Sequence, residues 1–126
     1  MKAVVQEAVT ELRAAFPAAV VTADDDGSGG AFVTVDPIDP GPAYTQGETW
    51  LGFHIGHNYP DADVYPLFVR AGLARADGGG HGPGFGVAEF REQPALQLSR
   101  RSNQRAAEFD TAVRKVHKVM EWLHTQ

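Results

Sequence analysis

The sequence predicts one α+β domain over residues 1–126: an N-terminal helix, an antiparallel sheet of about four strands, a long glycine-rich flap and a C-terminal helix. Three observations predict this class. Apolar residues recur every three or four positions near both ends of the chain, and short β-branched runs separated by turn residues lie between them. Six of the 14 glycines fall between Gly78 and Gly86. With 126 residues, 43% of them apolar, the chain can bury one modest core.

Both helices are predicted from apolar spacing. The first ends before Pro17, because proline cannot continue a helix; its apolar positions are Val5, Ala8, Val9, Leu12, Ala15 and Phe16. Asp110 or Thr111 is expected to cap the last helix. Its stripe is Val113, Val116, Met120 and Leu123, widened by Val119.

The sheet is predicted from short runs bounded by glycine, proline and aspartate. Residues 24–30 are expected to form a turn, and residues 36–42 are expected to leave the sheet because three prolines cannot donate to a ladder. The strand at residues 64–70 is expected at an edge, and residues 72–94 are expected to be an irregular flap. The predicted strands are residues 18–22, 31–35, 50–55, 64–70 and a short one at 95–99.

Composition excludes several kinds of chemistry. Cysteine is absent, which excludes disulfides, thiolate metal sites and thiol nucleophiles. Residues 1–94 hold 5 basic and 13 acidic side chains, whereas residues 95–126 hold 6 basic and 3 acidic ones. A nucleic-acid surface normally needs more positive charge, so no nucleic-acid partner is expected. The chain contains no run of 18 apolar residues and its start lacks a secretory pattern, so we expect a cytoplasmic protein with no membrane partner.

The glycine-rich flap and the histidines are two candidate ligand sites. The segment Gly82–Gly86 resembles part of a phosphate loop, but no Gly-Lys-Ser/Thr follows it, and no cofactor is expected. His54, His57 and Asp61 are residue types that bind metal ions. Positions three apart on a strand face opposite ways, so these side chains would converge only if Gly56 made a turn. A small metal-binding protein is therefore a third hypothesis.

Hydroxyl chemistry is a further candidate. Ser99 and Ser102 follow the last predicted strand and flank Arg100 and Arg101, whose charges could stabilise an oxyanion. A serine nucleophile also needs a nearby base. No Gly-x-Ser-x-Gly elbow is present, which argues against an α/β-hydrolase.

One stretch resembles a known superfamily. The run from Trp50 to Pro60 ends in Tyr59-Pro60 and is followed by Pro66 and an edge-type strand. This pattern, with the order of elements along most of the chain, resembles the UBC/RWD superfamily, and within it the prokaryotic ubiquitin-conjugating-enzyme-like proteins. The resemblance implies a ubiquitin-like modifier protein and an activating enzyme as partners, and transfer of the modifier to an amine as the activity.

The chain departs from that pattern, since it has neither the catalytic cysteine nor the His-Pro-Asn motif. Ser99 lies nearest the expected cysteine position. One hypothesis is therefore a transferase that carries the modifier as an oxyester on Ser99, with His81 as general base and Arg100 or Arg101 at the oxyanion. The alternative is a catalytically inactive UBC/RWD-like module that docks a modifier or an activating enzyme.

Overall fold

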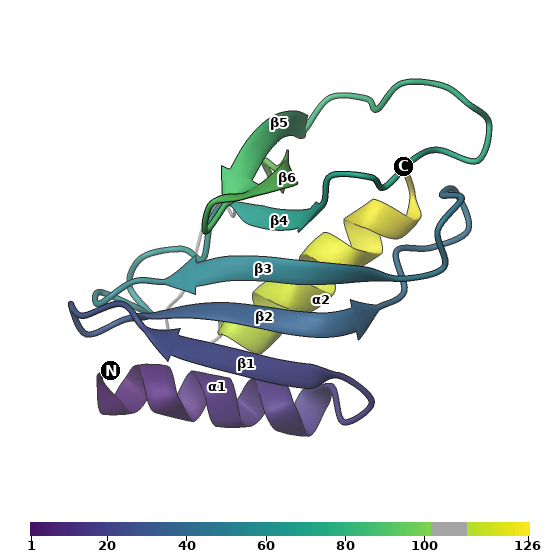
Figure 1. Ribbon diagram of the computed structural model, residues 1–126. Coiled ribbons are helices and arrows are strands. Elements are labelled where there is room, and N and C mark those ends of the chain that lie inside the picture. Colours follow the sequence, from purple (N-terminus) through teal and green to yellow (C-terminus); the bar gives the residue numbers. More distant parts are fainter. Residues whose placement is uncertain (102–110) are drawn as a thin grey trace.

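The computed structural model describes residues 1–101 and 111–126 (Figure 1). In that part of the chain, two helices pack on a six-stranded antiparallel sheet with strand order β1-β2-β3-β4-β6-β5. The α+β class is confirmed, but the sheet has more strands than predicted. The elements are α1 (Ala3–Ala15), β1 (Val20–Asp25), β2 (Ala31–Ile38), β3 (Thr49–Ile55), β4 (Leu67–Arg70), β5 (Phe85–Phe90), β6 (Gln93–Leu98) and α2 (Ala112–His124).

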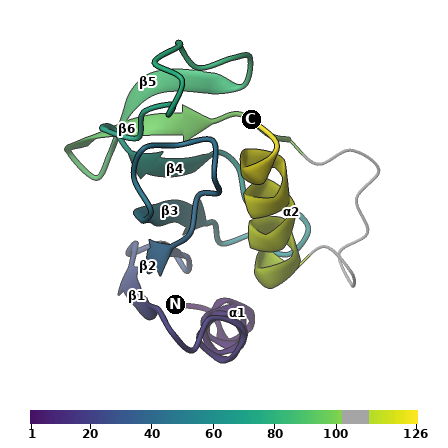
Figure 2. The ribbon, with the colours of Figure 1, turned by 90° about the vertical axis from the view of Figure 1, so that its right-hand side faces the viewer.

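Both helices cover the same face of the sheet, and the other face stays open in the described part of the chain (Figure 2). Strand alternation explains this division. In β3, Leu51, Phe53 and Ile55 are fully buried on the helix side, while Trp50 and His54 point to the open side. The core therefore lies between one sheet face and the two helices.

Helix α1 follows its predicted stripe and ends at Ala15, before Pro17. Its buried residues are Val5, Ala8, Val9 and Leu12. In α2, Thr111 caps the helix by accepting a hydrogen bond from the Arg114 backbone N–H at 3.3 Å, as expected, whereas Asp110 lies outside the described residues. The buried stripe of α2 is rotated from the prediction: Val113 and Met120 are only partly buried, and the buried positions are Ala112, Lys115, Val116, Val119 and Leu123.

The first hairpin is longer than predicted. β1 continues to Asp25, so the turn begins at Asp26 instead of Asp24. The Asp26 carboxylate accepts hydrogen bonds from the backbone N–H groups of Ser28 and Gly30, at 2.7 and 2.9 Å. Because the Asp26 side chain closes the turn, Asp24 and Asp25 remain part of β1.

The expectation that residues 36–42 leave the sheet was wrong at its first positions. β2 continues through Pro37 to Ile38. The β2–β3 register shifts between Val35 and Ile38, and the β1–β2 ladder ends at Asp36. Pro37 therefore lies at an irregularity where no ladder donor is required of it, which is where a sheet tolerates proline.

The predicted flap over residues 72–94 was wrong in its second half, where β5 and the start of β6 form a hairpin. Its two turn residues, Arg91 and Glu92, have positive φ angles of 50° and 70°. The hairpin adds to β4, which consequently lies inside the sheet and is not the edge strand that was predicted. The flap was predicted from the glycines that precede this hairpin, whereas β5 itself contains only one glycine, Gly86, and is defined by its pairing with β6.

The first half of the flap is irregular but attached to the loop after β2. Tyr44 forms an isolated bridge with Arg75, and backbone N–H groups of Thr45 and Ala76 donate to the carbonyls of Ala74 and Ala43, at 2.7 and 2.8 Å. Among the described residues, neither helix is long and apolar enough to cross a lipid bilayer.

Candidate functional site

The predicted nucleophile, Ser99, is exposed immediately after β6. Its backbone N–H donates to the Gly84 carbonyl at 2.7 Å, which extends the β5–β6 pairing by one bond. Its hydroxyl accepts a hydrogen bond from the Gln97 side-chain amide at 3.1 Å. An amide cannot remove a proton, so this contact does not activate the hydroxyl. Ser102 lies outside the described residues.

The predicted base, His81, is held by other contacts. Its Nε2–H donates to the Leu73 carbonyl at 2.7 Å, and its ring stacks on Phe85 with centroids 4.6 Å apart. Its Nδ1 is buried and has no hydrogen-bond partner in the part of the chain that the structure describes. Within residues 1–101 and 111–126, no hydrogen bond joins His81 to Ser99.

The two predicted oxyanion arginines each lie over an aromatic ring. The Arg100 guanidinium is 5.1 Å from the Trp122 ring centroid, and that of Arg101 is 4.2 Å from the Tyr65 ring centroid. Cation–π contacts of this kind hold a guanidinium in place. Ser99 directly precedes the two arginines in the chain, but in the structure each guanidinium lies over an aromatic ring.

A buried ion pair that the sequence analysis missed fixes this end of the domain. Lys115 and Asp63 have side chains 5% and 12% exposed, and Lys115 Nζ donates to Asp63 Oδ2 at 2.9 Å. The same Nζ donates to the Arg100 carbonyl at 2.5 Å. In the sequence, the burial of Lys115 is indicated only by its position next to Val116, which belongs to the predicted apolar stripe of the last helix.

The Tyr59-Pro60 stretch, which carries the family resemblance, packs against the start of α2. Tyr59 is buried, and its hydroxyl accepts a hydrogen bond from the Ala112 backbone N–H at 3.0 Å. The first N–H groups of a helix lack partners within it, so the tyrosine satisfies one of them. This residue joins the turn after β3 to the closing helix.

The three predicted metal ligands do not form a site. His54 Nε2 lies 2.6 Å from Asp26 Oδ2 across the first hairpin, while His57 and Asp61 lie beyond the end of β3. No group of three His, Asp or Glu side chains suited to a metal ion exists among the described residues. The metal-binding hypothesis was wrong in its choice of ligands, because Asp26 takes the His54 ring instead.

The hydrogen bonds to Asp26 give a pH-dependent contribution to stability. The bond from His54 first, and then those from Ser28 and Gly30, lower the Asp26 pKa from 3.8 to about 2. A depressed pKa in the folded state stabilises the fold above the unfolded value, and this contribution is lost as pH falls through about 2.

In Asp26→Asn, the free energy of unfolding should therefore decrease less than in the unmodified chain as the pH falls from 4 to 2. At pH 7 the variant should be less stable than the unmodified chain. Urea unfolding across that range measures both effects. The pH profile of Asp25→Asn is the matched comparison, because a hydrogen bond from the N-terminal ammonium group also lowers the Asp25 pKa. An Asp26→Asn profile parallel to that of the unmodified chain would contradict this prediction.

The open face of the sheet carries an aromatic cluster that no motif predicted. Phe90, on the last hairpin, lies over Gly52 at the centre of β3. Its ring centroid is 5.1 Å from that of Phe68, 5.9 Å from that of Trp50 and 6.4 Å from that of Phe32. A side chain at position 52 would collide with the Phe90 ring, so glycine permits this close packing.

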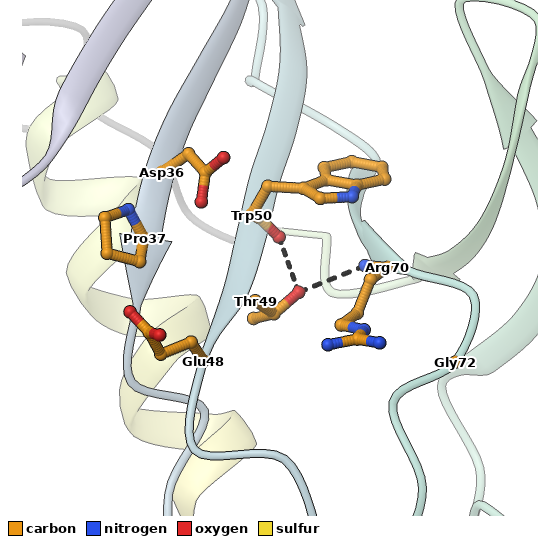
Figure 3. Close-up of a pocket in the computed structure, with 7 residues that line it drawn as sticks. All are labelled: Asp36, Pro37, Glu48, Thr49, Trp50, Arg70 and Gly72. Carbon is orange, nitrogen blue, oxygen red and sulfur yellow. Dashed lines mark hydrogen bonds between the residues drawn. The ribbon is translucent and has the colours of Figure 1, made fainter.

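Next to Trp50 the same face contains an open pocket of about 620 Å³ (Figure 3). Thr49 forms its floor: the hydroxyl donates to the Trp50 carbonyl at 2.8 Å and accepts from the Arg70 N–H at 3.1 Å, which ties β3 to β4. Strand alternation in β3 puts Trp50 on the same face as Gly52 and His54. Only the pairing of β2, β3 and β4 brings the pocket together; its lining residues are Asp36, Pro37, Glu48, Thr49, Trp50, Arg70 and Gly72.

Comparison with models of known protein families found no match, and searches of curated proteins and of solved structures found no similar chain.

Proposed function

We propose that this chain is a non-catalytic UBC/RWD-like docking module, which binds a protein partner of a ubiquitin-like conjugation pathway without carrying it covalently. The observation that favours docking over transfer is the state of Ser99: its hydroxyl accepts from the Gln97 amide, while the His81 Nε2–H is bound to the Leu73 carbonyl. A hydroxyl without a base is a weak nucleophile at neutral pH.

The family assignment rests on sequence and element order. Helix α1, the antiparallel run β1 to β4 and the closing helix α2 follow the order that the resemblance implies. Tyr59 of the Tyr-Pro turn contacts that closing helix. The β5–β6 hairpin, in contrast, occupies part of the segment where a flap beside a reactive residue was expected. This departure also supports docking, because it fixes in the sheet a region that a transferase would use around its nucleophile.

The first experiment asks whether Ser99 is reactive, using a fluorophosphonate, which labels activated serines. We expect Ser99 to be labelled no faster than Ser28, an exposed serine in the first hairpin turn, when peptides are mapped by mass spectrometry. Rapid labelling at Ser99 that disappears in His81→Ala would overturn the proposal in favour of an acyl carrier.

The second experiment uses a purified ubiquitin-like modifier and activating enzyme with ATP, chosen from the genes that neighbour this one. The expected product is a reversible complex, with a Kd unchanged by Ser99→Ala and no covalent adduct. An adduct that survives thiol, is cleaved by mild hydroxide and is absent in Ser99→Ala would establish the oxyester carrier. Absence of any complex with either protein would contradict docking.

A further inference from the structure

The pocket beside Trp50 is separate from the Ser99 end of the domain. In the β4–β6 ladder, Leu67 pairs with Leu98 at the Ser99 end, whereas Arg70 pairs with Ala95 at the other end. The helices leave one face of the sheet open (Figure 2), and the pocket lies at this second end of that face (Figure 3). A partner that docks on this face of the sheet would therefore reach the side chains that line the pocket.

The walls of the pocket carry charges of both signs beside an indole ring. Asp36 and Glu48 are exposed on one side of Trp50, and the exposed Arg70 lines the other side (Figure 3). In the part of the chain that the structure describes, neither carboxylate takes part in a side-chain hydrogen bond or an ion pair. The two carboxylates outnumber the one guanidinium, so the pocket favours a cation.

The same sheet face already shows how such a surface holds a guanidinium. Asp24 and Phe32 are directly paired across β1 and β2, and Arg91 binds both: it forms an ion pair with the carboxylate and lies 4.9 Å from the ring centroid. Asp36 and Trp50 also lie on neighbouring strands, directly after and before the Val35–Leu51 pair, although the register shift that follows Val35 means that they are not a direct pair. An acidic residue beside an aromatic ring on neighbouring strands thus occurs twice on this face.

We propose that this pocket binds an arginine side chain presented by the docked partner, with the guanidinium against Trp50 and between Asp36 and Glu48. A planar guanidinium suits this environment better than an ammonium group, because it can stack on an aromatic face and bind carboxylates through paired N–H donors. Trp50 is held for this contact by its packing against Phe90 and by the Thr49 bond to its carbonyl. The inference names the recognised chemistry of the partner and in that respect rests on the proposed docking function.

The probe is N-acetyl-arginine amide, and the signal is the indole N–H of each tryptophan in the ¹H–¹⁵N spectrum. Trp122 packs on Phe85 far along α2 and serves as an internal control. We expect a saturable shift of the Trp50 signal at millimolar probe, with at least tenfold weaker binding of N-acetyl-citrulline amide, a neutral analogue of the same shape. Equal shifts with both probes, or equal shifts of both tryptophans, would overturn the proposal.

Substitutions of opposite sign sharpen the test. Asp36→Asn and Glu48→Gln should each weaken binding of the arginine probe at least threefold, whereas Arg70→Gln should strengthen it because a like charge is removed. All three side chains are exposed, and the dispersed spectrum reports whether each variant is folded. Weaker binding in Arg70→Gln would contradict a cation site.

The partner complex separates this inference from the proposed function. If the modifier or activating enzyme binds the unmodified chain and binds the Asp36→Asn/Glu48→Gln variant equally well, the pocket inference fails and docking stands. If the arginine probe binds as expected but neither protein forms a complex, the docking function fails and the cation site stands.

Discussion

Replacing Lys115 by methionine should lower the free energy of unfolding by about 3–5 kcal/mol, which is a large part of the stability of a domain of this size. The substitution removes the ammonium group that lies 2.9 Å from the Asp63 carboxylate, whose side chain is 12% exposed. It also removes the bond from Lys115 to the Arg100 carbonyl, which fixes the chain after β6. Urea unfolding followed by far-UV circular dichroism measures the loss.

Two further variants decide whether burial causes this effect. The double variant Lys115→Met/Asp63→Leu should recover most of the lost stability, because an apolar pair can replace a buried ion pair at little cost. Arg114→Met, one position earlier on the exposed side of α2, should change stability by no more than about 0.5 kcal/mol. A loss below about 1 kcal/mol in Lys115→Met would mean that water screens the pair as it screens surface ion pairs.

The second large effect is expected for Gly30→Ala, at about 3 kcal/mol, the upper range for overpacking a buried site. A Cβ at this buried position would collide with the Ile55 carbonyl oxygen and lie 2.6 Å from Asp26 Oδ2. The carbonyl belongs to the β2–β3 backbone, so relief of the clash requires the strands themselves to separate. Displacement of Asp26 would also disturb its contact with His54.

The matched control is Gly47→Ala, in the loop before β3, where a new Cβ would meet nothing within 4 Å. This variant should be neutral or slightly stabilised, because alanine restricts the unfolded chain. Thermal and urea unfolding of both variants provide the comparison. Equal stability of Gly30→Ala and Gly47→Ala would show that the first hairpin can open at this point without cost.

The element order predicted from the sequence differs from the structure over residues 85–94, where β5 and the start of β6 replace part of the predicted flap. The sequence predicts a flap over residues 72–94, since the glycines between Gly78 and Gly86 leave almost no side-chain pattern. The structure instead pairs Phe85 with Leu98 and Phe90 with Gln93. Phe90 then covers Gly52, so the hairpin completes the aromatic cluster of the open face. A segment without periodicity thus supplies a central residue of the candidate docking surface.

The candidate catalytic residues illustrate the same limit. Ser99 became a candidate because it lies nearest the cysteine position that the resemblance implies, with Arg100 and Arg101 directly after it, and His81 because it lies in the predicted flap. The stacking of His81 on Phe85 and of the arginines over Trp122 and Tyr65 depends on neighbours that sequence spacing does not reveal. Position along the chain therefore did not reveal whether the hydroxyl is activated.

Local periodicity, turn residues and composition predicted the α+β class, both helices, the strands that overlap β1 to β4 and β6, and the absence of thiol chemistry, because these signals depend only on neighbours along the chain. Tertiary structure alone decided the last hairpin, the burial of Lys115 against Asp63, and the pocket that joins Asp36, Trp50 and Arg70. These features depend on which strands pair and on which helix face meets the sheet. Such long-range contacts leave no regular spacing in the sequence.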